Sequence, residues 1–129
     1  MNTENGKSLV ERFLRLMEAR DLETAESLMA PGAKIIFPGD HQFASQREVV
    51  AAASGRYQWI KKRFEDIEAF QQDDGIIVYV RGTLYGSNLN DIPFADIRFI
   101  DRFVVENGRI VKQDVWNDLA ETGVLSRVS

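Results

Sequence analysis

The spacing of apolar residues changes near residue 60 of this 129-residue chain. Before that point apolar side chains recur at helical intervals, and after it they alternate with polar ones, as in half-buried strands. Turn signals interrupt the alternating half at 73–75, 86–91 and 106–108. They leave four expected strands, at about 61–72, 76–86, 94–105 and 109–117. Because consecutive strands joined by short turns pair with each other, this half is predicted to form an antiparallel meander.

The first half of the chain predicts three helices and one strand. Capping residues place the expected helix starts at Ser8, Asp21 and Ser45. The first helix is expected over 8–20, and Pro31–Gly32 is expected to stop the second before a strand at 34–37. The predicted fold is therefore α+β, with a curved antiparallel or mixed sheet wrapped round three N-terminal helices. The length predicts a single domain over 1–129.

Composition excludes several classes of function. The formal net charge of −4 argues against a nucleic-acid partner, and the one basic cluster, Lys61-Lys62-Arg63, is expected to be a solvated strand or turn edge. The longest apolar run, Ile76 to Val80, is too short to cross a bilayer, so no membrane partner is expected. With no cysteine and a single histidine, neither a metal nor a cofactor is predicted, and the cytoplasm is the expected location.

Asp101 is the most informative acid in the sequence, because its strand face is otherwise apolar. A lone carboxylate in such a setting must be paired, hydrogen-bonded or protonated. One interpretation is a buried structural pair with Arg81 or a tyrosine, which would lower the pKa of Asp101. The other is a pocket acid that exchanges a proton with a ligand oxygen, and apolar surroundings would raise its pKa.

A curved sheet closed by helices leaves a cone whose open end is the natural ligand pocket. Tyr79 and Arg81 share one face of their strand, and we expect them to be polar contacts in the pocket beside Asp101, although periodicity also allows that face to be in water. The last strand carries Gln113, Val115 and Asn117 on its expected inner face. A shift of one residue in register would turn Asp114 inward instead.

Other candidate pocket residues lie at the expected mouth of the cone. His41, in the loop PGDHQF, is either solvated or a proton-transfer group. Tyr57 and Trp59 follow the third helix, where they either pack in the core or line the pocket.

The opposite, outer face of the sheet predicts a partner. Trp116 and Ile110, together with the row formed by Val78 and Val80, would make a broad apolar surface. Since exposed apolar sheet is usually covered, we expect a homodimer through this face.

The order of elements, the stretch RFLRLMEARDLETAESLMAPGAKIIFP at 12–38 and the stretch FIDRFVVENGRIV at 99–111 together resemble the nuclear transport factor 2-like superfamily. Within it the sequence looks closest to SnoaL-like small bacterial proteins, whose relatives include ketosteroid isomerase, polyketide cyclases, limonene epoxide hydrolase and scytalone dehydratase. The resemblance implies a cone-shaped, cystatin-like α+β barrel with a deep apolar pocket, and commonly a homodimer. It says little about function, because one fold hosts many.

The resemblance also implies roles for individual residues. Asp101 matches the aspartate that completes the oxyanion hole of ketosteroid isomerase, but Phe13 stands where the tyrosine of that hole would be and Phe37 where its base would be. The acid that cyclases and the epoxide hydrolase carry on the last strand is replaced by Gln113 or Val115. Isomerisation by the ketosteroid isomerase mechanism is therefore not expected.

Two hypotheses about function follow. In the first, the protein binds a small, mostly apolar, oxygen-bearing molecule and carries out acid/base chemistry of the isomerase, cyclase, dehydratase or hydrolase type, with Asp101 and His41 as catalytic candidates. Aromatic residues such as Phe103 would line the pocket. In the second, the same fold is a non-catalytic module that binds a ligand or another protein.

Overall fold

The computed structural model describes all 129 residues. The helices are α1 (Thr3–Glu18), α2 (Leu22–Ser27), α3 (Gln46–Ala53) and the short α4 (Leu119–Thr122), followed by a 3₁₀ turn at Val124–Ser126. The strands are β1 (Met29–Phe37), β2 (His41–Phe43), β3 (Tyr57–Gln72), β4 (Gly75–Asn88), β5 (Pro93–Glu106) and β6 (Arg109–Asn117). None of the helices has the length and apolar character needed to cross a membrane.

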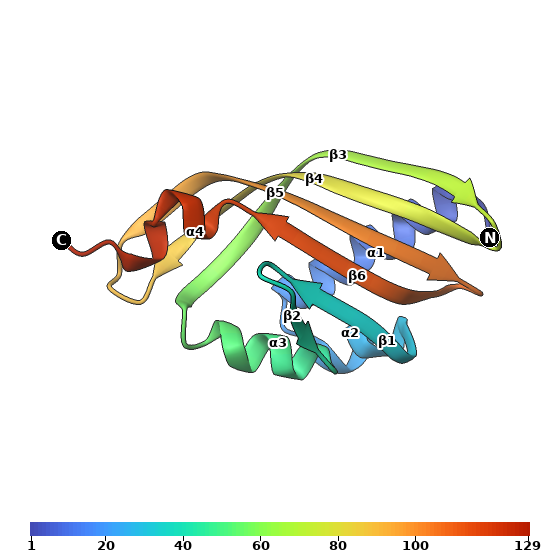
Figure 1. Ribbon diagram of the computed structural model, residues 1–129, viewed down its shortest axis with the longest axis horizontal. Helices are drawn as coiled ribbons and strands as arrows, with labels where there is room; N and C mark the ends of the chain where they lie inside the picture. Colours follow the sequence, from blue (N-terminus) through green and yellow to red (C-terminus); the bar gives the residue numbers. More distant parts are fainter.

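The six strands form one curved sheet in the order β2-β1-β6-β5-β4-β3. Strands β3 to β6 make the expected antiparallel meander, while β1 pairs in parallel with β6 and carries β2 on its other edge. Figure 1 shows α1 running behind the sheet and α3 beside the β1–β2 hairpin. The expected cone-shaped α+β fold is confirmed.

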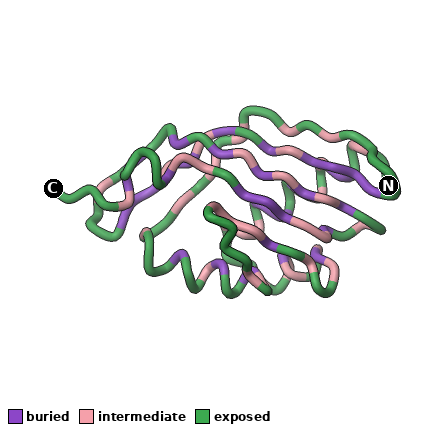
Figure 2. The backbone as a smooth tube through the Cα atoms, in the orientation of Figure 1, coloured by how far each residue is buried: buried purple, intermediate pink, exposed green.

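One face of the sheet, called the inner face here, packs against α1. The register places Val80, Asp101 and Val115 side by side on β4, β5 and β6, and all three are buried. Phe103, two residues from Asp101, meets Phe13 of α1 edge to face with ring centroids 5.8 Å apart. Figure 2 shows the buried segments concentrated along these central strands. The inner face and α1 therefore enclose the core in which Asp101 lies.

A glycine allows the sheet to bend where β3 passes β4. The pairing of the two strands is irregular between Phe64 and Asp66, which places an extra residue in β3. A Cβ on Gly82 would lie 1.9 Å from the carbonyl oxygen of Arg63, so any other residue at this position would push the strands apart.

The helix and strand boundaries differ from the expected ones where a local signal was overlooked. Helix α1 begins five residues early, because Asn2 and Asn5 form a reciprocal capping box ahead of Ser8. Strand β1 begins at Met29 and runs through Pro31–Gly32, which the structure accommodates in an irregular part of the pairing with β6. The N-caps at Asp21 and Ser45 are confirmed by hydrogen bonds from backbone N–H groups to their side chains.

Most of the residues predicted to form an apolar outer surface lie elsewhere. Val78 and Val80 are fully buried on the inner face, because they share it with Asp101. Ile110 is also buried, since the irregular pairing of β5 with β6 between Val105 and Val104 turns it inward. Only Trp116 of that set is exposed on the outer face.

Candidate functional site

Asp101 is enclosed by the core, with 1% of its surface exposed. Neither of its carboxyl oxygens accepts a hydrogen bond from the protein. Burial raises the pKa of Asp101 to about 6, and the positive charge of Lys62 opposes part of that rise. A carboxyl with this pKa can change its protonation state near neutral pH, which is the property required of an acid/base group.

Lys62 is the cation that faces Asp101. Its ammonium lies 3.8 Å from Asp101 Oδ2 and 5.3 Å from the centre of the Phe99 ring. The expected solvated position of this lysine is therefore wrong. Lys62 shares its strand face with Ile60 and Phe64, so it points inward from β3 rather than into solvent.

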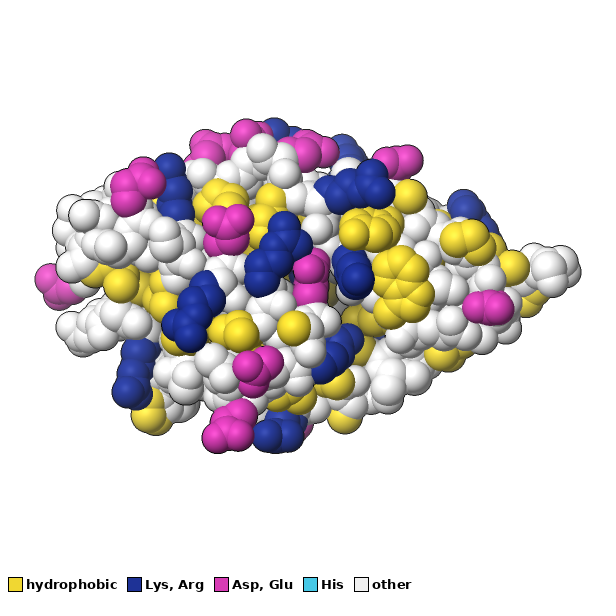
Figure 3. Space-filling model, turned by 180° about the vertical axis from the view of Figure 1, so that it is seen from behind, with side chains coloured by type: hydrophobic (Ala, Val, Ile, Leu, Met, Phe, Trp, Pro, Cys, Tyr) yellow, Lys and Arg dark blue, Asp and Glu magenta, His cyan; other side chains and the backbone are white.

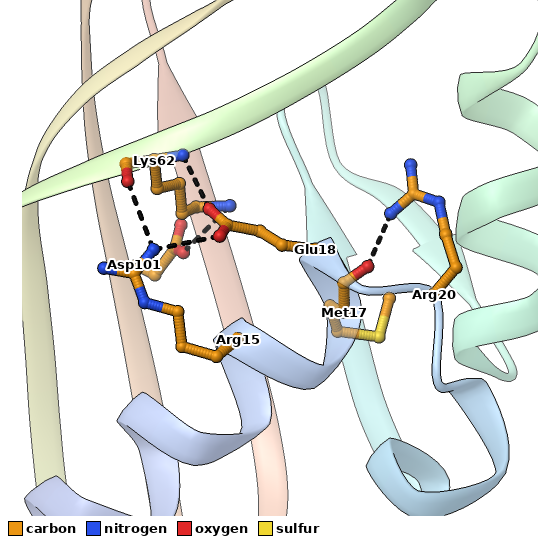
Figure 4. Close-up of polar contacts among 6 residues, drawn as sticks. All are labelled: Arg15, Met17, Glu18, Arg20, Lys62 and Asp101. Carbon is orange, nitrogen blue, oxygen red and sulfur yellow. Dashed lines mark hydrogen bonds and ion pairs between the residues drawn. The ribbon is translucent and has the colours of Figure 1, made fainter.

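The end of α1 holds the backbone of Lys62 in place, as Figure 4 shows. Glu18 Oε2 accepts a hydrogen bond from the Lys62 N–H at 2.7 Å, and Arg15 donates to the Lys62 carbonyl at 3.4 Å. Arg15 also pairs with Glu18 at 2.9 Å. These contacts fix the backbone of Lys62 against the end of α1, next to the space beside α3.

That space is an inner cavity of about 90 Å³ between α1, α3 and β3, and Lys62 forms part of its wall. Asp101 does not line it, so the lysine separates the aspartate from the cavity. The polar wall also includes Glu18, Gln46 and Gln113. Gln46 donates to Gln113 Oε1 at 2.8 Å, and both amides are buried. The last-strand position at which the family resemblance implies an acid is thus occupied here by a glutamine with a partner of its own.

An outer cavity of about 380 Å³ lies next to the inner one. The two share four wall residues, which are Phe37, Val49, Ala53 and Tyr57. The outer cavity alone falls within the usual size range for small-molecule sites, whereas the inner cavity is far too small for a whole ligand. The arrangement suits a ligand whose body fills the outer cavity and whose end reaches toward Lys62.

Tyr57 stands between the two cavities and has two arginines near its hydroxyl. Burial raises the pKa of Tyr57, while the charges of Arg20 and Arg56 and a hydrogen bond from Arg20 oppose the rise. Tyr57 follows the third helix, as expected, and is the first residue of β3. His41, on β2, lines the outer cavity and is exposed.

Several residues expected to face the ligand are packed in the core instead. Phe13 and Phe103 have no exposed surface and line neither cavity, and Val115 is buried beside Asp101. Phe37, Tyr57, His41 and Gln113 do line the cavities. Gln113 and Val115 lie opposite Phe103 and Asp101 of β5, so they face inward as expected.

Other expected pocket residues lie on the outer face, and their predicted contacts with Asp101 are wrong. Arg81 is on the opposite side of β4 from Val80 and pairs with Glu65 and Asp66 of β3. Tyr79, on the same side as Arg81, stacks on Phe70.

Trp59 and Asn117 also lie away from both cavities. Trp59 meets Tyr85 edge to face and is 42% exposed, so it lies neither in the core nor in the pocket. Asn117 accepts a hydrogen bond from the Leu119 N–H and so belongs to the start of α4.

The largest surface hollow, about 610 Å³, crosses the outer face from the β1–β2 turn to β3. Its charged residues pair with each other, Arg81 with Glu65 and Arg98 with Asp118. Because these charges are already satisfied and exposed, we place the candidate site at the inner and outer cavities, where charged groups are buried or unpaired.

Two important site residues were missed in the sequence. Lys62 could have been found from the alternation of β3, because it shares parity with Ile60 and Phe64. Gln46 follows the helix cap Ser45, and no local pattern shows that its side chain turns inward to reach Gln113.

The protein is an α+β cone in which two adjoining cavities lie between the helices and the sheet. The model of the family described as "SnoaL-like domain" matches residues 10–113, and the chain belongs to this family. The resemblance seen in the sequence is thereby confirmed. A comparison with curated protein sequences finds no match.

Several solved structures share the fold at low sequence identity. An NTF2-like protein of unknown function from Burkholderia pseudomallei is 19% identical with a TM-score of 0.79, and the alignment covers 95% of this chain and 98% of that one. TerC, co-crystallised with polyporic acid, is 17% identical with a TM-score of 0.76, covering 93% and 97%. A proposed SnoaL-like polyketide cyclase from Jannaschia sp. is 16% identical with a TM-score of 0.72, covering 97% and 94%. At these identities the likeness is one of fold.

Proposed function

We propose that residues 1–129 act as one SnoaL-like domain that binds a small, mostly apolar, oxygen-bearing molecule in the outer and inner cavities. The observation that carries this proposal is the pairing of buried Asp101 with half-buried Lys62, which forms part of the wall of the inner cavity. A ligand oxygen placed there would accept a hydrogen bond from Lys62. The polyketide cyclases among the structural neighbours support a ligand of this kind.

The same pair supports acid/base chemistry of the isomerase, cyclase, dehydratase or hydrolase type. A fixed ammonium can stabilise negative charge that develops on a carbonyl oxygen during proton transfer. Asp101 does not reach the cavity, so in this proposal it is a positioning residue that holds Lys62 and sets its charge environment. His41, at the wall of the outer cavity, is the proposed proton-transfer group on the opposite side.

A second candidate function is ligand binding without catalysis. The observation that favours it is the Gln46–Gln113 hydrogen bond. Gln113 occupies the last-strand position at which the family resemblance implies an acid, and its side chain is already engaged by Gln46. Both candidates use the same cavities, and turnover distinguishes them.

The test is a thermal-shift screen of steroids, terpenoids and aromatic polyketides, followed by turnover assays of the ligands that bind. We expect at least one class to raise the melting temperature of the wild type and of the outer-face control Arg98→Met. We expect Lys62→Met to weaken that binding and to remove any turnover. If no compound raises the melting temperature, the small-molecule proposal is wrong.

We further propose that the protein forms a homodimer through its outer face and works in the cytoplasm. Trp116 is 50% exposed there, and a large aromatic side chain exposed on a sheet face is usually covered by a partner. Sedimentation that gives the 14.7 kDa monomer at every concentration would contradict the dimer.

A further inference from the structure

The two arginines beside Tyr57 have no acidic partner in the protein. The ion pairs of the chain include neither Arg20 nor Arg56. Arg56 lines the outer cavity, which has no aspartate or glutamate in its wall, and Arg20 lines the inner one. In a chain with a net charge of −4, two unpaired arginines at two adjoining cavities give this region a charge opposite to that of the whole protein.

The position of Arg20 is fixed by its backbone and by a hydrogen bond. Its φ of 60° lies in the left-handed region, which is uncommon for a residue other than glycine. Its guanidinium donates to the Met17 carbonyl at 2.7 Å, and Figure 4 shows the side chain directed away from the Lys62 cluster and toward α3. The remaining guanidinium N–H groups are left for Tyr57 and for a ligand.

Acidic groups of the cavity do not compete for these arginines. Glu18 is the only acid in either wall, and it is engaged by Arg15 and by the Lys62 N–H. The rest of the outer cavity is mainly apolar, with Phe37, Phe43 and Val49 in its wall. Figure 3 shows the back of the molecule, where lysine and arginine side chains lie among hydrophobic and acidic ones.

We propose that Arg20 and Arg56 form an anion-binding subsite that selects ligands with a carboxylate on an apolar body. The carboxylate binds between the two guanidinium groups beside the Tyr57 hydroxyl, and the apolar body lies against the aromatic wall of the outer cavity. This inference rests on the proposed function, because it adds a ligand class to the same cavities.

The test compares acids with their neutral amides by isothermal titration calorimetry at pH 7.5. The probes are naphthalene-2-carboxylate, biphenyl-4-carboxylate and decanoate, each against its primary amide. We expect at least one acid to bind about tenfold more tightly than its amide, since a charge-assisted pair is about twice as strong as a neutral hydrogen bond and tenfold corresponds to about 1.4 kcal/mol.

Matched variants assign the effect to the subsite. Arg56→Met is expected to weaken binding of the acid about tenfold and leave the amide unchanged. Arg47→Met removes the same charge from an exposed position of α3 that lines neither cavity, and it is expected to change neither ligand. Melting temperatures of both variants show that they are folded.

The outcomes separate this inference from the proposed function. Equal binding of acid and amide in all three pairs, or equal loss in Arg47→Met and Arg56→Met, overturns the anion-binding subsite and leaves the proposed cavity intact. Absence of binding by all six compounds overturns both.

Discussion

Raising the pH from 4 to 7 lowers the free energy of unfolding of the wild type by about 2 kcal/mol more than it does for Asp101→Asn, because the pKa shift of about two units carries about 1.4 kcal/mol per unit and the unfolded carboxyl is still partly protonated at pH 4. The pKa of Asp101 is about 6 in the folded protein, against an ordinary value of 3.8. Between these values the folded chain holds a proton that the unfolded chain has released, so stability falls as the pH rises. The loss is complete about one pH unit above the folded pKa, near pH 7. Urea unfolding across this range measures the difference.

A control variant removes one carboxylate without touching the core. Asp73→Asn, in the exposed β3–β4 turn, is expected to follow the wild-type pH dependence. Parallel stability curves for the wild type and Asp101→Asn would show that the Asp101 carboxyl titrates normally.

Phe13→Ala is expected to cost about 4 kcal/mol of stability, the usual loss when a fully buried phenylalanine is truncated. Phe13 has no exposed surface and packs edge to face on Phe103, between α1 and the inner face. Phe70→Ala, at a 47% exposed position on the outer face, is the matched control and is expected to cost less than about 1 kcal/mol. Chemical denaturation of both variants provides the comparison, and similar costs would contradict the placement of Phe13.

Alternation within a strand predicted much of the fold. Each of the four expected meander strands corresponds to an observed strand, and Asp101 lies on a buried face as its apolar neighbours indicated. The capping residues Asp21 and Ser45 also located two helices correctly. These features depend on residues close together in sequence, which is why a single chain reveals them.

The candidate site was harder to predict because it depends on pairing between strands. Alternation alone did not show that Val80, rather than Arg81, shares the face of Asp101, since that follows from the β4–β5 register. Ile110 lies on the inner face rather than the expected outer face, because the pairing of β5 with β6 is irregular beside it. No turn signal in the sequence indicates this irregularity. Lys62 was hidden in a basic run, although its parity with Ile60 and Phe64 already indicated an inward side chain.

The separation of Asp101 from the cavity changes the chemistry that it can perform. A carboxyl at the cavity wall would exchange protons with the ligand itself, whereas this one faces Lys62 and has no exposed route to the ligand. Lys62 is therefore the group that meets the ligand, and the charge of Asp101 determines how strongly the lysine is held.

The central claim is that Asp101 is a buried acid whose only charged partner is the cavity lysine. The direct measurement is a carbon-13 NMR titration of the Asp101 carboxyl in the wild type and in Lys62→Met. We predict a pKa of about 6 in the wild type and a higher value in the variant, because the lysine charge that opposes the rise is gone. An ordinary pKa near 3.8 in the wild type, or an unchanged value in Lys62→Met, would contradict the account.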